Sequence, residues 1–233
     1  MKHIAIVMAA GSGKRMGSNV PKQFLEINGK PILYYPLKVL ESSFVDEIIL
    51  VTRHEDISYC KDNIVDKYSF KKVTKIVAGG AERYDSVYAG LKAVDETDSY
   101  IYIQDGARPM LTLDILERTR EDVVNYSATV VAMPVKDTIK IADENGKIIS
   151  TPGRETLWTA QTPQAFSYAV IKAAYDLLYQ AKENAMPFKI TDDGQVVENY
   201  SSVDVHITKG DYSNIKVTTP EDINVAEKFL ENL

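Results

Sequence analysis

Only one cysteine, Cys60, is present among the 233 residues, and a single thiol excludes an internal disulfide. Nothing near Cys60 in the sequence indicates an activated thiol, so we expect a core or surface residue. Histidine is also scarce, and none of the three has a neighbour at metal-ligand spacing. The chain therefore lacks a nucleophile–base pair. Phosphoryl transfer is a reaction class that needs little acid–base machinery, because positioning and charge neutralisation do most of the work.

Long apolar runs are missing as well. No run approaches membrane-spanning length, and Ile4–Val7 near the N-terminus is too short for the core of a signal peptide. Acidic residues outnumber basic ones, which gives a net charge of −6. This balance argues against nonspecific nucleic-acid binding, whereas a local basic pocket would still indicate a small anionic ligand. We expect a soluble cytoplasmic protein with neither nucleic acid nor membrane as a partner.

The composition is that of an ordinary globular protein, with 45% hydrophobic residues, and strand-like segments alternate with helical ones. We expect strands at Ile4–Ala9, Glu47–Thr52, Val73–Val77, Tyr100–Gln104, Ala128–Met133 and Val205–Thr208. We expect helices at Pro31–Leu40, Glu82–Val94, Leu113–Tyr126, Tyr168–Ala181, about Asp192–Asn199, and from Pro220 after an N-cap at Thr219. The alternation predicts an α/β fold, with a mainly parallel sheet covered by helices on both faces, in one domain over residues 1–233.

Three chemically distinctive stretches each follow a predicted strand: Ala9–Arg15, Gly79–Arg83 and Asp105–Arg108. Ligands of parallel sheets bind beyond the carboxyl ends of the strands, where these stretches would converge. The Gly79–Arg83 stretch precedes a helix, so its backbone could meet a base edge or a phosphate, and Ser86 lies one turn further on.

The loop Met8–Phe24 combines small residues with cations. Its small residues are Ala9, Ala10, Gly11 and Gly13. They allow close approach of the backbone, whose successive N–H groups can hold an anion, and Arg15 and Lys22 add the charge that a triphosphate needs. The loop is not a P-loop, because no Gly-Lys-Ser/Thr follows with the right spacing, and it is not GxGxxG, because Met16 occupies the third glycine position. A plain strand-to-helix turn with scattered surface charges is the alternative.

Asp105 directly follows a predicted strand and precedes Gly106. Its carboxylate could reach a Mg²⁺ ion bound to phosphates, since this ion prefers oxygen ligands, although a turn aspartate before a glycine is also common. Arg108 suits either an anionic substrate or a structural ion pair. The candidate cations for charge stabilisation are Arg15, Lys22, Arg154 and Lys216.

Residues 136–161 interrupt the α/β alternation. Thr138–Ala142 and Lys147–Thr151 flank an Asp-Glu-Asn-Gly turn, in which Gly146 takes the position that needs a positive φ. This hairpin has no obvious core face, and isolated two-stranded hairpins are marginal in water. We therefore expect the arm to pack either on its own domain or on a second subunit.

Together these motifs resemble the 2-C-methyl-D-erythritol 4-phosphate cytidylyltransferase family. The matching segments, in order, are Met8–Met16, Pro21–Gln23, Gly79–Val87, Asp105–Pro109, Asp137–Lys140, Gln161–Gln164, Thr191–Asp193 and Asn214–Asp222. The resemblance implies transfer of CMP from CTP to methylerythritol 4-phosphate, with release of pyrophosphate, in non-mevalonate isoprenoid synthesis. It also implies a Rossmann-like nucleotidyltransferase (GT-A-like) fold with a protruding hairpin, a Mg²⁺ cofactor, and a homodimer built through the arm.

The resemblance further implies roles for single residues. Catalytic cations would be Arg15, Lys22, Arg154 and Lys216. The nucleotide would be held by Ala9, Ala10, Gly11, Gly13, Gly80, Ala81, Ser86, Asp105 and Gly106, with Asp105 on the metal. The polyol phosphate would be bound by Arg108, Thr138, Arg154, Thr162 and Lys216, of which Thr138 and Arg154 come from a neighbouring subunit. Departures from the usual family pattern are Gln104 for His, and Gly106 and Gly194 for Ala.

Three other functions fit the sequence less well. The related ribitol 5-phosphate cytidylyltransferases carry Leu-Ala-Gly-Gly in the first loop and Ser-Asp-Ala-Cys late in the chain, whereas this sequence has Ala9-Ala10-Gly11 and Thr191–Asp193. A non-catalytic CTP-binding regulator would have no need of both Arg15 and Lys22. A dinucleotide-binding dehydrogenase is disfavoured because the third glycine is missing and no acid closes the strand near Val51.

Overall fold

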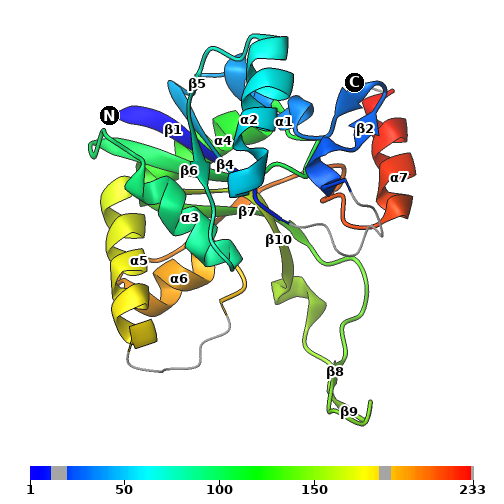
Figure 1. The fold of residues 1–233 in the computed structure, drawn as a ribbon. Coiled ribbons are helices and arrows are strands. Elements are labelled where there is room, and N and C mark those ends of the chain that lie inside the picture. The colour runs from blue at the N-terminus through cyan, green and yellow to red at the C-terminus, as the bar shows by residue number, and fades with distance from the viewer. Residues whose placement is uncertain (12–19, 184–189, 232–233) are drawn as a thin grey trace.

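The computed structural model describes residues 1–11, 20–183 and 190–231, and a seven-stranded sheet forms its centre (Figure 1). The strand order is β11-β7-β10-β6-β1-β4-β5. The strands are β1 (Lys2–Ala9), β4 (Glu47–Thr52), β5 (Val73–Ala78), β6 (Ser99–Asp105), β7 (Ala128–Pro134), β10 (Trp158–Ser167) and β11 (His206–Lys209). All neighbouring pairs are parallel except those of β10, which runs antiparallel to β6 and β7. The predicted mainly parallel α/β sheet is confirmed.

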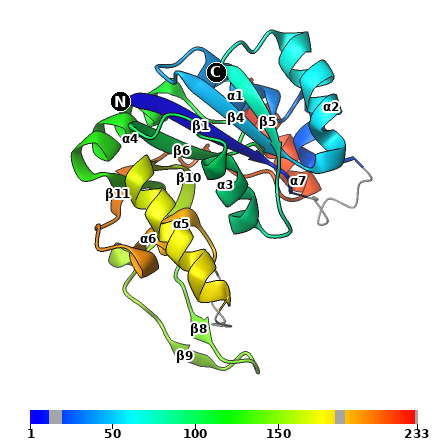
Figure 2. The ribbon, with the colours of Figure 1, turned by 60° about the vertical axis from the view of Figure 1, so that its left-hand side comes forward.

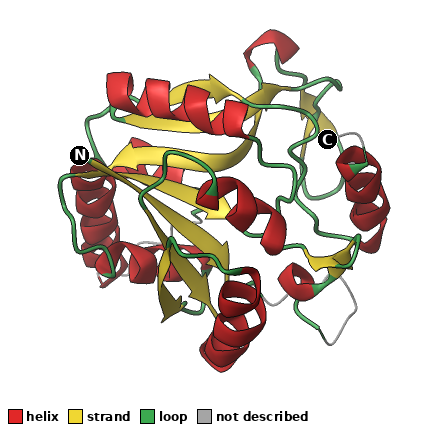
Figure 3. Cartoon of the chain, turned by 90° about the horizontal axis from the view of Figure 1, so that it is seen from above, coloured by secondary structure: helices red, strands yellow, loops and turns green. Residues whose placement is uncertain are grey.

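Helices cover both faces of this sheet, as the view from above shows (Figure 3). In β1, Ala5 and Val7 pack on one face, against α1 (Tyr34–Glu41), α2 (Ile57–Cys60) and α4 (Leu113–Tyr126). The alternate residues, Ile4 and Ile6, pack on the other face, against α3 (Arg83–Lys92), α5 (Tyr168–Glu183) and α6 (Asp193–Tyr200) (Figure 2). Because both faces are buried, the strand reads as a continuous apolar run.

The first helix begins later than the sequence predicts. Lys30–Pro31 forms the short strand β3, which pairs with β2 (Glu26–Ile27) around a turn in which Asn28 has φ 49° and Gly29 has φ 70°. The helix therefore starts at Tyr34 rather than at Pro31. Pro36 then lies in its first turn, where a missing backbone N–H costs no hydrogen bond.

Strand β10 was not predicted, and the proposed arm boundary at residue 161 falls inside it. The segment carries Pro163 together with Gln161, Thr162 and Gln164, a composition that argues against a central strand. The ladder to β7 accommodates it with an irregularity between Ala160 and Gln164. The sequence analysis also did not predict the helical segment after β4. This segment consists of the 3-10 turn η3 (His54–Asp56), α2, and the π-helical η4 (Lys61–Asp66).

The arm itself protrudes from the sheet as a short ribbon of β8 (Ile141–Ala142) and β9 (Ile148–Ser150) (Figure 1). Its paired strands are shorter than predicted, and every residue from 136 to 151 is exposed. Gly146 has φ 79°, as the turn motif predicts.

The C-terminal helix α7 (Pro220–Leu230) begins with a capping box between Thr219 and Asp222, which confirms the predicted start. Its apolar stripe packs with the β2–β3 hairpin around buried Ile27 and Ala226, whereas the stripe residue Leu233 lies outside the described residues. Within the described ranges, none of the helices combines the length and apolar character that crossing a membrane requires.

Candidate functional site

A cavity of about 340 Å³ lies beyond the carboxyl ends of β1 and β6, where the three distinctive stretches of the sequence meet. It is lined by Met8, Ala9, Ala10, Gly11, Lys22, Gln23, Gly80, Ala81, Glu82, Arg83, Ser86, Asp105, Ala107 and Lys216. Two lysines, one arginine and two carboxylates thus face a space of small residues and backbone groups. The arrangement suits a polar, anionic ligand of nucleotide size.

The first wall continues β1 into the small-residue loop. Gln23 holds the carboxyl end of β1 in place, because its Nε2 donates to the Ala9 carbonyl at 2.5 Å. Lys22 begins the single turn η2 (Lys22–Phe24), and its Nζ donates to the Val217 carbonyl at 3.0 Å. Of the residues predicted for this wall, Gly13 and Arg15 lie outside the described residues.

The second wall is the turn between β5 and α3. A Cβ atom at Gly79 would lie 2.8 Å from that of Ala10, so glycine allows the two walls to approach each other. Ser86 Oγ accepts a hydrogen bond from the Gly80 N–H at 3.1 Å. Glu82 caps α3 in a reciprocal pair with Asp85, which fixes where the helix begins.

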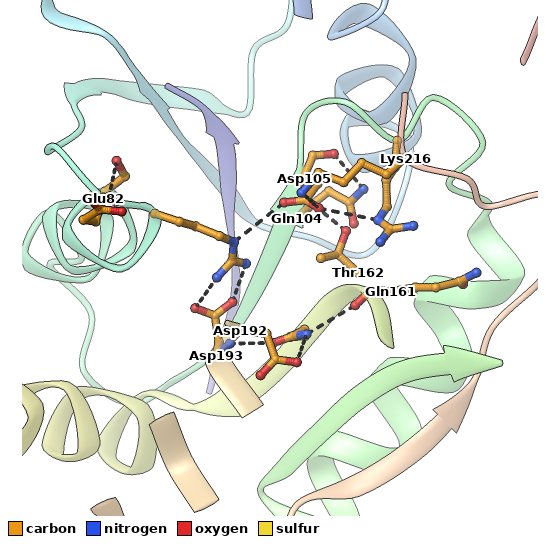
Figure 4. Close-up of polar contacts among 12 residues, drawn as sticks. Glu82, Gln104, Asp105, Gln161, Thr162, Asp192, Asp193 and Lys216 are labelled. Carbon is orange, nitrogen blue, oxygen red and sulfur yellow. Dashed lines mark hydrogen bonds and ion pairs between the residues drawn. The ribbon is translucent and has the colours of Figure 1, made fainter. Parts of the chain in front are cut away.

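Asp105 forms the floor of the cavity and is surrounded by cations (Figure 4). Its Oδ2 lies 2.8 Å from Lys216 Nζ and 3.5 Å from Arg108 Nε, and its Oδ1 lies 4.0 Å from Arg83 Nε. Burial alone would raise the pKa of Asp105, but Lys216, Arg83 and Arg108 together hold it well below its usual range. The carboxylate is therefore ionised at neutral pH.

A divalent cation fits this floor only as a partner of the ligand's own phosphates. Among the residues that the structure describes, no group of three or more His, Cys, Asp or Glu side chains is arranged to hold a metal ion. Mg²⁺ is commonly bound by one or two carboxylates together with substrate phosphates and water. Asp105, ionised and facing the cavity, provides the carboxylate that such a site requires.

The remaining predicted residues fall into two groups. Thr162 and Arg108 lie against Asp105 but do not line the cavity: Thr162 Oγ1 accepts from the Asp105 N–H at 3.1 Å, and Arg108 donates to the Asn214 carbonyl at 2.7 Å. Thr138 and Arg154 are exposed at the arm, where Arg154 donates to the Lys136 carbonyl at 3.0 Å. The subunit described here therefore does not bring the arm residues to the cavity.

Gly106 also lies off the cavity surface, with its N–H donating to the Met8 carbonyl at 2.9 Å. A glycine is favoured at this position because a Cβ atom would lie 2.8 Å from Leu33 Cδ1 and 3.0 Å from the Met8 carbonyl oxygen. The sequence analysis assigned no role to Arg83, which lines the cavity and contacts both Asp193 and Asp105. The only feature of the sequence that indicated Arg83 was its position in the Gly79–Arg83 stretch.

Cys60 and His3 lie apart from this chemistry. Cys60 is fully buried on α2, and burial raises the pKa of its thiol to about 11, so it is not an activated nucleophile. His3 lies with its Nδ1 2.8 Å from the Tyr102 hydroxyl at the opposite end of β1.

Comparison with known proteins gives one consistent result. The family model IspD, described as 2-C-methyl-D-erythritol 4-phosphate cytidylyltransferase, matches residues 3–232. A Lachnospira eligens protein of that name is 51% identical over 228 residues, covering 97% of this chain and 98% of its own length. One from Clostridium botulinum strain 657 is 48% identical over 233 residues, covering 100% and 99%. The crystal structure of the Anaerococcus prevotii 4-diphosphocytidyl-2C-methyl-D-erythritol synthase superposes with a TM-score of 0.84 at 35% identity, covering 99% of this chain and 96% of that one.

Proposed function

The chain belongs to the 2-C-methyl-D-erythritol 4-phosphate cytidylyltransferase family, and from that premise we propose that it transfers CMP from CTP to 2-C-methyl-D-erythritol 4-phosphate. The products are 4-diphosphocytidyl-2-C-methyl-D-erythritol and pyrophosphate. The observation that carries the proposal is the cavity, which unites the small-residue loop with Lys22, Asp105 and Lys216.

The reaction is a displacement at phosphorus. A phosphate oxygen of the polyol phosphate attacks the α-phosphorus of CTP, the new P–O bond forms, and the bond to the β-phosphate oxygen breaks. The electron pair leaves on pyrophosphate, and the ionised phosphate has no proton to lose to a base. The absence of a nucleophile–base pair is therefore consistent with this chemistry, in which cations stabilise the developing charge.

The residues at the cavity divide this work. Ala9, Ala10, Gly11, Gly80, Ala81 and Ser86 hold the nucleotide through backbone groups and one hydroxyl. Gly106 supports the end of β1 from behind the cavity surface, and Gly13, outside the described residues, is assigned to the same ligand. Lys22, Lys216 and Arg15, the last outside the described residues, neutralise phosphate charge. Asp105 would hold a Mg²⁺ ion that accompanies the nucleotide, and the ion would supply further charge neutralisation.

The second substrate requires the arm of a partner subunit. Thr162, Arg108 and Lys216 adjoin the floor of the cavity, whereas Thr138 and Arg154 are exposed on the arm of the same subunit. In a homodimer joined through the arm, the partner's arm would bring the second pair to the polyol phosphate. The exposed fractions of Ile141 (49%), Ile148 (57%) and Ile149 (65%) support burial of this ribbon in a dimer.

Pyrophosphate release tests the function directly. The protein is incubated with CTP, Mg²⁺ and, in parallel reactions, 2-C-methyl-D-erythritol 4-phosphate, D-ribitol 5-phosphate or no acceptor. We expect release with the methylerythritol phosphate. Release with ribitol phosphate alone would replace the proposed acceptor, and CTP binding without release in any reaction would identify a regulator.

A further inference from the structure

Three segments of the sequence meet at the edge of the cavity: Gly79–Val87, Gln161–Gln164 and Thr191–Asp193. Arg83 from the first makes a two-pronged ion pair with Asp193 from the third, with NH1–Oδ1 3.0 Å and NH2–Oδ2 2.6 Å. Asp193 is fully buried, and its Oδ1 also accepts from the Tyr175 hydroxyl at 2.6 Å. A buried carboxylate with this many donors is held in one orientation.

Gln164 fixes the backbone from which Asp193 projects. Its Oε1 accepts from the N–H groups of Asp193 at 2.9 Å and Gly194 at 3.0 Å, and its Nε2 donates to Asp192 Oδ2 at 3.1 Å (Figure 4). Asp192 caps α6 through the Gln195 N–H at 2.9 Å. The start of α6 is thus bound rigidly to the central strand β10.

The ion pair between Arg83 and Asp193 affects the charge around Asp105. Both terminal nitrogens of Arg83 donate to Asp193, whereas its Nε lies 4.0 Å from Asp105 Oδ1. Burial lowers the pKa of Arg83, but Asp193 and Asp105 hold it above its usual value, so Arg83 is a permanent cation. Asp193 offsets part of this charge, although Arg83 still contributes to the lowered pKa of Asp105. Without Asp193, the full charge of Arg83 would act on Asp105 and compete with any other cation for the carboxylate.

We propose that Asp193 is a positioning residue for the reaction: by holding Arg83 in a closed ion pair, it keeps Arg83 from joining Lys216 and Arg108 as a further close cation at Asp105, so that the carboxylate can still bind the divalent cation that accompanies the nucleotide. This inference rests on the proposed function, because it concerns the metal-assisted binding of CTP. It assigns a common purpose to the segments around Arg83, Gln164 and Asp193, which lie on different elements.

The test measures CTP binding by calorimetry across a Mg²⁺ titration, with no acceptor present and therefore no turnover. For Asp193→Asn we expect the Mg²⁺ concentration at half-maximal enhancement of CTP binding to rise about 10- to 100-fold. Binding without Mg²⁺ should change little, because Arg83 keeps its charge. The double variant Asp193→Asn with Arg83→Met lacks the unpaired cation, so its Mg²⁺ dependence should return toward that of the wild type.

Tyr175→Phe is the matched control, because it removes another hydrogen bond to the same carboxylate and leaves Arg83 paired. It should lower the melting temperature without moving the Mg²⁺ dependence. An equal shift in Asp193→Asn and Tyr175→Phe, or no recovery in the double variant, overturns the proposal. If Asp193→Asn does not fold, Arg83→Lys tests the proposal instead. This variant keeps the positive charge but loses the two parallel hydrogen bonds of the guanidinium to Asp193. The proposal then requires a higher Mg²⁺ concentration at half-maximal enhancement of CTP binding. Failure of the wild type to bind CTP overturns the proposed function instead.

Discussion

Lys216 Nζ lies 2.8 Å from Oδ2 of Asp105, although the two residues come from opposite halves of the chain. The segment that carries Lys216 is held onto the loop after β6, because the Val217 N–H donates to the Ala107 carbonyl at 2.8 Å. Val217 also accepts from Lys22 at 3.0 Å. A C-terminal segment thus completes a cavity whose other lining residues, among those that the structure describes, come from the first half of the sequence.

Lys22→Ala should lower kcat far more than it raises KM for CTP. Lys22 lines the cavity, and a cation whose contact strengthens as charge develops contributes to the transition state rather than to ground-state binding. The loss should be on the order of 2.7–4 kcal/mol in transition-state stabilisation. Steady-state pyrophosphate release at varied CTP measures both constants.

Lys71→Ala is a matched control for this variant, because Lys71 is exposed at the amino end of β5, opposite the cavity. It should leave both constants unchanged. If Lys22→Ala retains a kcat near that of the wild type, Lys22 is a surface charge that stabilises the Val217 segment.

Asp105→Asn should raise the Mg²⁺ requirement strongly. Asparagine keeps the shape of the side chain but removes the charge that holds a hard cation, and it leaves Lys216, Arg108 and Arg83 without their shared counter-ion. A Mg²⁺ titration of pyrophosphate release measures the effect, and circular dichroism checks the fold. A titration curve that matches the wild type would mean that Asp105 is only a turn residue.

Asp222→Asn should destabilise the fold at neutral pH and have no effect in acid. Burial raises the pKa of Asp222, but hydrogen bonds from Thr218 and Thr219 outweigh it, so the pKa is lowered in the folded state. The ionised form therefore adds stability that is fully present above the unfolded pKa of about 4, and this stability is lost as the pH falls further through the lower pKa of the folded state. We expect a difference of about 1 kcal/mol or less, given solvent screening.

Urea unfolding at pH 7 and at about pH 3 measures this difference. The gap between Asp222→Asn and the wild type should close at the lower pH. A gap of the same size at both values would show that the loss comes from packing of α7 rather than from the charge of the capping carboxylate.

Arg154→Ala should weaken binding of the polyol phosphate and spare CTP, because Arg154 is exposed at the base of the arm and does not line the cavity. The guanidinium suits a phosphate, since its planar fork donates two parallel hydrogen bonds. Measured KM values for the two substrates separate these effects.

Mixing variants tests whether Arg154 serves the partner's site. A dimer of one Arg154→Ala subunit and one Lys22→Ala subunit would have one site with both lesions and one with neither. Activity should return to about half that of the wild type in each mixed dimer, by counting sites in a two-fold dimer. With subunit exchange verified by mass spectrometry of tagged chains, a mixture that stays inactive would place Arg154 in its own subunit's site.

Local signals in the sequence were sufficient for much of the fold. The apolar run Glu47–Thr52 and the amphipathic Leu113–Tyr126 appear as β4 and α4 with their predicted ends. Gly146 and Thr219 also take their predicted turn and cap positions. Each of these depends on interactions among residues close in the chain, or on which face of one element is apolar, and both can be read from spacing alone.

The partners of the buried polar side chains could be identified only from the tertiary structure. Strand β10 contains Pro163 and buried glutamines, and it is stable at the centre of the sheet because distant groups satisfy them: Gln161 donates to the Asp211 carbonyl at 2.8 Å, and Gln164 bonds to the start of α6. Arg83 and Asp193 are separated by 110 positions, so no local pattern pairs them. The sequence by itself determined the elements that have a clear apolar period and the stretches that carry chemistry, because these follow from local periodicity and residue type. Only the tertiary structure decided which charge faces which, because a buried polar group is stable only beside the partner that the fold brings to it.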